Sequence, residues 1–190
     1  LLDAMGVSSR LPSTVDWLNR SLPGRVVSMV EELAPNPRRV AVLGLAYKPH
    51  TNVVDESQGI AIARQLAGKG FTVTVFDPVA MDSARRVLGE TVQYAPSAAE
   101  CAREAAIIVI ATGWTEFSSI LQQTETLNPR PLIIDGWRLA RGSVASSDGK
   151  FYRGIGIGRS DYDTGERLRH LVERLAVPKA ADDEAAPTPA

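Results

Sequence analysis

The sequence predicts an α/β fold: a Rossmann-like, doubly wound parallel sheet preceded by an N-terminal helical segment. Short apolar runs alternate with amphipathic stretches along the chain, as they do in successive βαβ units. Several of these runs lack polar alternation, which is typical of strands buried on both faces of a parallel sheet. The 190 residues are 44% hydrophobic and 23% charged, enough to build a core, so disorder throughout the chain is excluded.

Residues 1–36 are predicted to be the helical segment. Apolar side chains recur there at steps of three and four and would line one helix face: Leu18, Leu22, Val26, Val30 and Leu33. Ser13 or Thr14 is a candidate cap for the start of the helix, and Pro23-Gly24 should kink it or divide it in two. Pro35-Asn36-Pro37 should end it.

Residues 37–176 are predicted to form the Rossmann-like domain. The expected strands are 39–44, 71–78, 92–94, 107–112 and 131–135, with a possible edge strand at 151–157. The expected helices between them contain residues 60–66, 83–88, 97–103 and 117–121. The strands are rich in β-branched and aromatic residues, whereas Gly68, Gly70 and Pro78 mark ends of elements, and Ser97 is expected to cap a helix. Right-handed crossovers between parallel strands would place helices on both faces.

The last part of the sequence is less regular. A loop is expected at Gly142–Gly149, and a charged helix at Glu166–Leu175. Residues 177–190 are rich in Ala, Pro, Asp and Glu, a composition typical of a mobile tail.

The charge and composition limit the function. Lys and Arg number 21 and Asp and Glu 22, a net charge of −1, which argues against a protein that binds nucleic acid or membranes through bulk positive charge. One cysteine excludes an internal disulfide framework, and the two histidines, His50 and His170, lie far apart, so we expect no metal site. No apolar run reaches the roughly 20 residues of a membrane span. Leu1–Arg10 does not resemble a signal peptide, and we expect a cytoplasmic protein. Because the chain does not begin with Met, we also expect it to be a piece of a longer protein.

The first strand-to-helix turn lacks the glycines of a dinucleotide site. It reads Gly44-Leu45-Ala46-Tyr47-Lys48, with one glycine where the phosphate-binding fingerprint has three. We therefore expect no standard NAD site there. The later run Gly154-x-Gly156-x-Gly158 has the wrong spacing and follows an edge strand, so it is not interpreted as a phosphate loop.

A polar loop, Lys48–Ser57, follows the first predicted strand. Ligands of open α/β sheets bind at the carboxyl ends of the strands, where the strand order reverses. Lys48 would offer an ammonium group there, and Thr51, Asn52 and Ser57 would offer hydrogen bonds, a set suited to a phosphorylated ligand. The alternative is a solvated loop in which Ser57 or Glu56 caps the next helix.

One segment carries a resemblance to a known family. Val40–Asn52, followed by Glu56-Ser57, closely resembles the signature that opens the C-terminal, nucleotide-sugar-binding domain of the UDP-glucose/GDP-mannose dehydrogenase family. The likeness continues at Phe76-Asp77-Pro78, Ala111–Phe117, Ile134-Asp135-Gly136 and Gly149–Gly156, and Val15–Val27 resembles the end of the family's central helical domain. It covers roughly residues 1–160.

The resemblance implies a division of labour. In the family, an N-terminal domain holds NAD, and a central helical domain pairs the subunits and bears a cysteine nucleophile. The C-terminal domain closes over the sugar nucleotide, whose 6-hydroxyl is oxidised to a carboxylate for polysaccharide precursors. This chain lacks the NAD fingerprint and the cysteine motif, so we expect no catalytic residue in it and no turnover by it alone. The implied partners are a UDP- or GDP-sugar and, through the helical segment, a second subunit.

The resemblance also assigns site residues. Lys48, Thr51, Asn52, Asp135 and Arg138 are expected to bind the nucleotide sugar. Cofactor contacts would come from Glu56 and position 55, where Asp55 replaces the family's arginine and would repel a pyrophosphate. Further departures are His50, Asn52 and Val53, which stand where the family has acidic residues, and Trp137, which displaces the expected arginine to Arg138.

Two interpretations therefore remain. The preferred one is the nucleotide-sugar-binding domain of such a 6-dehydrogenase. The alternative is a diverged, non-catalytic binding or assembly module with the same fold. In both, Cys101 is expected to be structural, because it lies within a short helix that has alanines on both sides of it, Ala98 and Ala99 before and Ala102 after.

Overall fold

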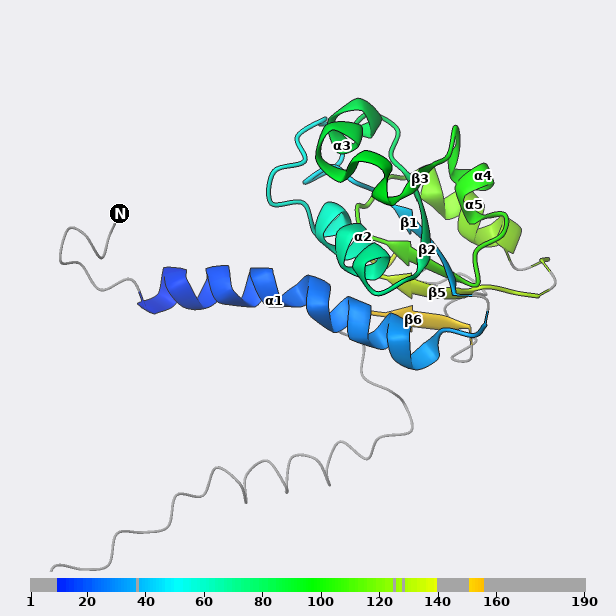
Figure 1. Cartoon of the computed structure of the whole chain (residues 1–190), viewed down its shortest axis with the longest axis horizontal. Coiled ribbons are helices and arrows are strands. Elements are labelled where there is room, and N and C mark those ends of the chain that lie inside the picture. The colour runs from blue at the N-terminus through cyan, green and yellow to red at the C-terminus, as the bar shows by residue number, and fades with distance from the viewer. Residues whose placement is uncertain (1–9, 37, 125, 128, 140–150, 156–190) are drawn as a thin grey trace, which may run out of the picture. The chain divides into compact units, whose positions relative to one another are not determined.

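A six-stranded, all-parallel sheet is the centre of the molecule. The computed structural model describes residues 10–139, except 37, 125 and 128, and residues 151–155. The strands are β1 (Arg39–Leu43), β2 (Thr72–Phe76), β3 (Gln93–Tyr94), β4 (Ile107–Ile110), β5 (Leu132–Asp135) and β6 (Tyr152–Gly154). Their order is β3-β2-β1-β4-β5-β6, the order typical of Rossmann folds, and it reverses between β1 and β4 (Figure 1). The predicted fold class is confirmed.

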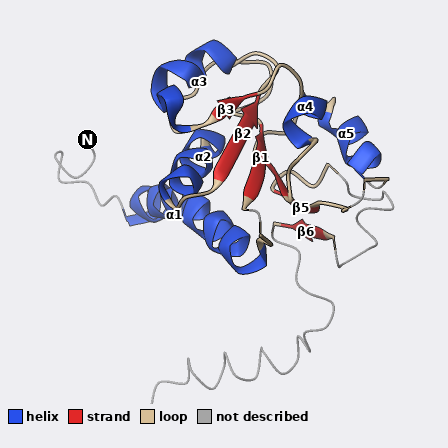
Figure 2. Cartoon of the chain, turned by 45° about the vertical axis from the view of Figure 1, so that its right-hand side comes forward, coloured by secondary structure: helices blue, strands red, loops and turns tan. Residues whose placement is uncertain are grey.

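Helices cover both faces of the sheet. They are α1 (Arg10–Leu33), α2 (Gln58–Gly68), α3 (Met81–Leu88), α4 (Ala98–Ala102) and α5 (Phe117–Thr124), with a 3₁₀ turn, η2, at Gly89–Thr91. α1 and α2 lie on one side of the strands, and α4 and α5 lie on the other (Figure 2). Each face therefore has its own apolar cluster.

β1 shows why the apolar runs lack polar alternation. Val40 and Val42 belong to the cluster under α1 and α2, whereas Ala41 and Leu43 belong to the cluster under α4 and α5. All four side chains are at most 1% exposed. Since successive strand residues point to opposite faces, a strand covered on both sides needs apolar residues at every position.

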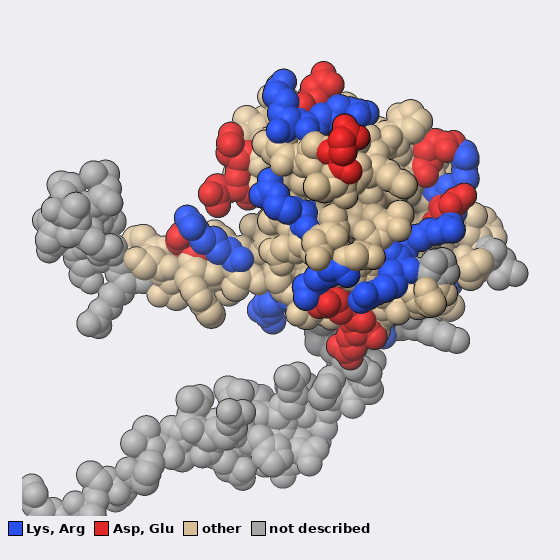
Figure 3. Space-filling view, viewed as in Figure 1, with Lys and Arg blue, Asp and Glu red and all other residues tan. Residues whose placement is uncertain are grey.

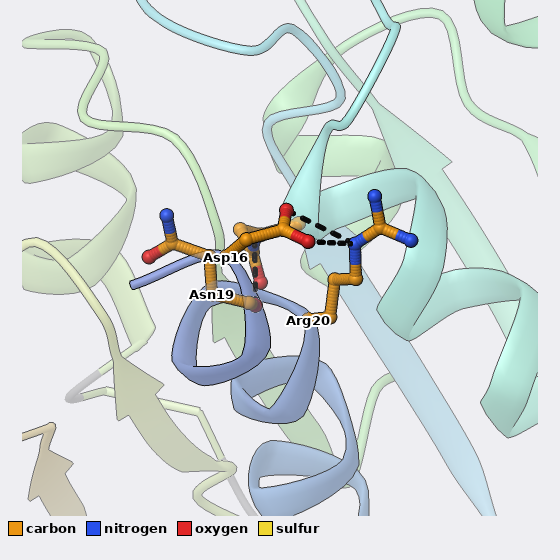
Figure 4. A network of polar contacts seen from close by, with 4 residues as sticks. Asp16, Asn19 and Arg20 are labelled. Atoms are coloured by element: carbon orange, nitrogen blue, oxygen red, sulfur yellow. Dashed lines mark hydrogen bonds and ion pairs between the residues drawn. The ribbon is translucent and has the colours of Figure 1, made fainter. Parts of the chain in front are cut away.

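α1 differs from the sequence prediction. It runs without a break from Arg10, so Pro23 does not divide it, and Ser13 and Thr14 lie inside the helix rather than at its N-cap. Proline has no N–H to offer the carbonyl four residues earlier, which here belongs to Asn19. The Gln58 side-chain amide donates to that carbonyl at 3.2 Å, beside the Asp16–Arg20 ion pair (Figure 4). This bond from α2 gives the freed Asn19 carbonyl a partner and so helps to accommodate Pro23 within a continuous helix.

The other element boundaries follow the sequence closely. Ser57 and Ser97 cap α2 and α4, their hydroxyls accepting from the N–H groups of Ile60 and Glu100. The strands are shorter than predicted by one to a few residues; β1 and β4 lose residues at the carboxyl end, β3 and β5 at the amino end, and β2 and β6 at both. The expected loop at 142–149, the helix at 166–175, the tail at 177–190 and the glycines Gly156 and Gly158 lie outside the described residues.

The described residues also contain no helix that is both long and apolar enough to span a membrane. Acidic and basic side chains both occur over the face seen in Figure 3. In the same part of the chain, no cluster of three or more His, Cys, Asp or Glu side chains could hold a metal ion.

Candidate functional site at the carboxyl edge of the sheet

The loops after β1 and β4 meet where the strand order reverses. The Thr112 hydroxyl, just after β4, donates to the Ala46 carbonyl in the loop after β1 at 2.8 Å, and both atoms are buried. Gly44 lies against this contact with φ 97°, and a Cβ there would come within 2.5 Å of Thr112. The glycine retained in the first turn therefore lets the two loops approach closely, at the place where open α/β sheets bind ligands.

The loop after β1 is closed at its base and presents Lys48. The Tyr47 N–H donates to the Val53 carbonyl at 2.8 Å, so the five intervening residues form a compact projection. Lys48 and Asn52 are exposed on it, whereas the Thr51 hydroxyl oxygen accepts the Val53 N–H at 3.2 Å. Lys48 forms no ion pair with any residue in the described part of the chain. Its ammonium group is available to an anion.

A histidine holds the tip of this projection. His50 has φ 63°, a conformation that non-glycine residues rarely adopt, and its ring meets the Trp114 ring edge-on at a centroid distance of 5.1 Å. Trp114 is 6% exposed and lies in the loop after β4. Backbone strain at a ligand-binding edge is a recurrent feature of functional loops.

Asp77, directly after β2, holds the loop after β1 in place through hydrogen bonds. Its Oδ2 accepts from the backbone N–H groups of Leu45 and Ala46 at 2.7 and 3.0 Å and from the Trp114 indole at 3.2 Å. Its Oδ1 accepts from the N–H groups of Val79 and Ala80 at 2.9 and 2.8 Å. The side chain is 1% exposed.

This carboxylate occupies the donors that a dinucleotide would use. In a dinucleotide-binding Rossmann domain, N–H groups of the first turn face the pyrophosphate, and an acidic residue after the second strand binds a ribose hydroxyl. Here the acidic residue turns inward and accepts from the turn itself. In this structure the Leu45 and Ala46 N–H groups of the turn are therefore bonded to the chain's own carboxylate.

The predicted residues after β5 have different environments. Asp135 is 0% exposed, and its carboxylate accepts from the Trp137 N–H at 2.9 Å and the Tyr152 hydroxyl at 3.0 Å. Burial, followed by the Asp135 charge and the hydrogen bond to it, raises the pKa of Tyr152. Arg138 is exposed, has φ 58°, and donates to the Ile155 carbonyl at 3.4 Å. Asp135 therefore shapes the turn that presents Trp137 and Arg138.

Asp55 and Glu56 lie beside α1. Both are exposed and line a cavity of about 850 Å³, whose other walls include Asn19 and Arg20 of α1 and Arg64 of α2. Lys48 does not line this cavity, but Tyr47, at the base of the projection, does. Asp55 stands two residues before Ser57, the N-cap of α2.

Cys101 is a core residue on α4. It is 3% exposed, and its thiol donates to the Thr74 carbonyl at 3.3 Å. Burial raises its pKa to about 12. A thiol held neutral in this way is a poor nucleophile, in accord with the structural role expected for it.

Sequence reasoning did not assign roles to three of the edge residues. Asp77 and Trp114 occur in segments that carry the family resemblance, and Trp137 directly follows one. No local pattern, however, shows that a carboxylate points inward or that an indole folds over a neighbouring loop. A polar residue directly after an apolar strand was the one available signal, and it applies to Asp77.

Comparisons with known proteins identify the family of this chain. The family model for the UDP binding domain of the UDP-glucose/GDP-mannose dehydrogenase family matches residues 41–142, just over half of the chain. The chain is similar to the UDP-glucose 6-dehydrogenase AglM of Haloferax volcanii, with 33% identity over 72% of this chain and 31% of that protein. It is also similar to TuaD, a UDP-glucose 6-dehydrogenase of Bacillus subtilis, with 34% identity over 63% of this chain and 26% of that protein.

A solved structure is similar over a larger part of the chain. The UDP-glucose dehydrogenase of Pyrobaculum islandicum matches with a TM-score of 0.67 and 31% identity, over 83% of this chain and 34% of that one. The GDP-mannose dehydrogenase of Pseudomonas aeruginosa, 17% identical with a TM-score of 0.65, shares the fold. The chain spans about a third of the length of these relatives.

Proposed function

This chain belongs to the UDP-glucose/GDP-mannose dehydrogenase family, as its UDP binding domain, and we propose that it holds the diphosphate of a UDP- or GDP-sugar at the carboxyl edge of its sheet. The observation that carries this proposal is the projection after β1, which presents the unpaired ammonium group of Lys48 beside the reversal of strand order. Asn52 and Thr51 add hydrogen-bonding groups to the same projection. A charge-assisted bond to phosphate is the interaction this arrangement can supply.

The turn after β5 supplies the opposite side of the proposed site. Arg138 is exposed there and offers donors that Ile155 does not use. Asp135 acts through the turn, because its carboxylate is occupied by Trp137 and Tyr152. We therefore propose Lys48 and Arg138 as groups that contact the nucleotide sugar, and Asp135 as a residue that positions Arg138.

The proposed activity belongs to a longer protein. The relatives are dehydrogenases about three times as long as the matched segment. We propose that the whole protein oxidises the 6-hydroxyl of the sugar to a carboxylate with NAD, in the cytoplasm, for polysaccharide precursors. In this proposal NAD is bound mainly outside residues 37–176, the nucleotide-sugar-binding domain, and this chain alone reduces none. The tail at 177–190 has no part in it.

Glu56 and Asp55 are the proposed contacts on the cofactor side. They line the cavity beside α1. We expect Asp55 to contact the cofactor weakly or not at all, because its carboxylate would repel a pyrophosphate. This one residue is the support for the alternative function, a binding or assembly module without a cofactor.

We also propose that residues 1–36 are the end of the central helical domain and pair two subunits. The support is a set of exposed apolar side chains on the first half of α1: Leu11 (76% exposed), Val15 (48%), Trp17 (68%) and Leu18 (44%). Exposed apolar surface of this kind is typical of interfaces. Sedimentation of the chain at increasing concentration tests this pairing, and a monomer throughout would contradict it for this part of the protein.

Replacing Lys48 by Ala tests the proposed site. We expect the affinity for UDP-glucose, measured by calorimetry, to fall by about 1.5–3 kcal/mol, the scale of a hydrogen bond to a charged group. Lys69→Ala is the matched control, because Lys69 lies at the end of α2 and pairs with Glu31. If the Lys48 variant and the wild type bind UDP-glucose with equal affinity, the projection is a solvated loop that does not contact the ligand.

A further inference from the structure

Trp137 combines exposure with an unusually fixed position. Its side chain is 47% exposed, yet its backbone N–H donates to Asp135 at 2.9 Å and its indole N–H donates to the Ala111 carbonyl at 2.9 Å. The ring also lies against Gly113, where a Cβ would come within 2.4 Å of Cε3 and 2.7 Å of Cδ2. The indole therefore stands in one orientation while about half of its surface faces solvent.

The ring lies beside the crevice between β1 and β4. Trp137 follows β5, but its indole reaches back over the loop after β4, where it bonds Ala111 and covers Gly113. The Ala111 N–H in turn donates to the Leu43 carbonyl at the end of β1. This places the indole against the loop that follows β4, beside the point where the strand order reverses.

The other two tryptophans have different environments. Trp114 is 6% exposed and its indole donates to Asp77, so it belongs to the core of the edge. Trp17, on α1, is 68% exposed and lies among the apolar residues of the proposed subunit interface. Tyr47 is also exposed at this edge, at 59%, but of the three tryptophans Trp137 alone lies at this edge with an exposed ring that a hydrogen bond of its own holds in place.

We propose that the Trp137 indole is a stacking surface for the nucleobase of the bound nucleoside diphosphate. The inference rests on the function proposed above and adds the group that binds the base, while Lys48 serves the phosphates. Aromatic stacking contributes about 1–3 kcal/mol per base, which is about 5- to 150-fold in affinity, and it tolerates different bases. Trp137 therefore raises the affinity for UDP and for GDP.

Calorimetric titration of the chain with UDP tests the proposal. Trp137→Ala should lower the affinity by about 5- to 150-fold, whereas Trp137→Phe, which keeps an aromatic ring, should retain most of it. Trp17→Ala is the matched control and should leave the affinity unchanged. The ratio of wild-type to Trp137→Ala affinity should be the same in about 50 mM and about 500 mM salt, because stacking is not screened, whereas the ratio for Lys48→Ala should shrink.

Gly113→Ala provides a second test, in which residue 137 remains tryptophan but its ring must move. Gly113 does not have a positive φ, so alanine fits its backbone, but the new methyl group must displace the indole. We expect a weaker affinity for UDP in this variant, and no further loss when the same change is added to Trp137→Ala. In the wild type, UDP should quench tryptophan fluorescence, and Trp137→Phe should abolish most of the quenching.

The possible results distinguish failure of the stacking proposal from failure of the proposed nucleotide-sugar-binding function. UDP binding that is equal in the wild type, Trp137→Ala and Gly113→Ala overturns the stacking and leaves the proposed function standing. A loss in Trp137→Ala that shrinks with salt, or that Trp137→Phe does not rescue, also overturns the stacking. A wild-type chain that binds neither UDP nor GDP contradicts the proposed function, and the stacking with it.

Discussion

At the scale of single residues, Asp77 joins several loops of the carboxyl edge through its carboxylate. Its two oxygens accept from five donors, which belong to the turns after β1 and β2 and to the indole of Trp114. Each buried N–H that loses such a partner costs about 1–3 kcal/mol. The position of the Lys48 projection therefore depends on a carboxylate from the neighbouring strand.

Replacing Asp77 by Asn should destabilise the fold strongly. An amide presents one oxygen, so its NH₂ group must face N–H donors on one side or the other. We expect the free energy of unfolding, measured by urea titration, to fall by at least about 3 kcal/mol. Asp82→Asn is the matched control: Asp82 is exposed in the first turn of α3, so the change should cost no more than about 1 kcal/mol. Equal stability of the two variants would show that the hydrogen bonds of Asp77 contribute little.

Cys101 gives the chain a dependence on alkaline pH. Burial raises its pKa to about 12 in the folded chain, whereas a thiol in the unfolded chain titrates near 8.5. Between these values the unfolded state releases a proton that the folded state keeps, so stability is full below about pH 8.5 and falls as the pH rises. The slope contributed by this thiol approaches about 1.4 kcal/mol per pH unit.

Cys101→Ala should therefore flatten the pH profile of stability. The comparison is the free energy of unfolding of the wild type and the variant at pH 8 and pH 10, where Tyr152, whose pKa burial also raises, contributes to both alike. The expected result is a smaller fall in the variant. Profiles of equal slope would mean that the thiol is solvated and that α4 does not cover it.

At the scale of elements, a hydrogen bond links α1 and α2 close to Pro23 of α1. Pro23 leaves the Asn19 carbonyl without a helical partner, and Gln58 of α2 supplies one at 3.2 Å. The second half of α1 then packs in the core through Val26, Val27 and Val30, which are 8%, 1% and 0% exposed. The polar bond and the apolar contacts together set how the helix meets the sheet.

The two residues should be energetically coupled. Gln58→Ala should cost about 0.5–1.5 kcal/mol of stability in the wild type, since it removes the partner of a carbonyl. In a Pro23→Ala background the carbonyl regains a helical N–H, so the same change should cost less. A double-mutant cycle by thermal or urea unfolding measures the difference, and a coupling energy of zero would mean that water already serves the Asn19 carbonyl.

The elements also show how far the sequence could predict this fold. Strand positions and the caps Ser57 and Ser97 follow from local patterns, because burial on both faces and capping each leave a signature in a few adjacent residues. The predicted division of α1 at Pro23 is wrong. The Asn19 carbonyl that the proline leaves free finds its partner in Gln58, which is 39 positions from Asn19 in the sequence. Long-range partners of this kind leave no local signal.

Of the candidate site, the sequence could predict positions along the chain but not contacts between loops. Lys48 was found because it stands just after a recognisable strand, and the structure places it, exposed, at the carboxyl edge. The inward orientation of Asp77 and the fold-back of Trp137 depend on contacts with other strands, so the sequence alone could not place them. The binding roles of all the predicted site residues stay predictions: Lys48, Thr51, Asn52, Asp55, Glu56, Asp135 and Arg138.

At the scale of the whole molecule, two places could be considered for ligand binding: the carboxyl edge of the sheet and a cavity beside β2, β3 and α4. The carboxyl edge carries the Lys48 projection, Trp137 and Arg138. At β2, β3 and α4, a second cavity of about 530 Å³ is lined by residues including Arg39, Thr74 and Glu104, and its Arg39–Glu104 pair is already satisfied at 2.6 Å. Binding of the nucleotide diphosphate at the carboxyl edge is the central claim.

Mapping of backbone amide shifts by NMR during a titration with UDP tests that claim most directly. The account predicts that the shifts gather in three loops of the carboxyl edge: residues 45–53, 111–114 and 136–138. Amides around the second cavity, at 72–74 and 100–105, serve as the internal reference and should stay unchanged. Shifts confined to those reference amides, or none in any loop of the carboxyl edge at saturating UDP, would contradict the account.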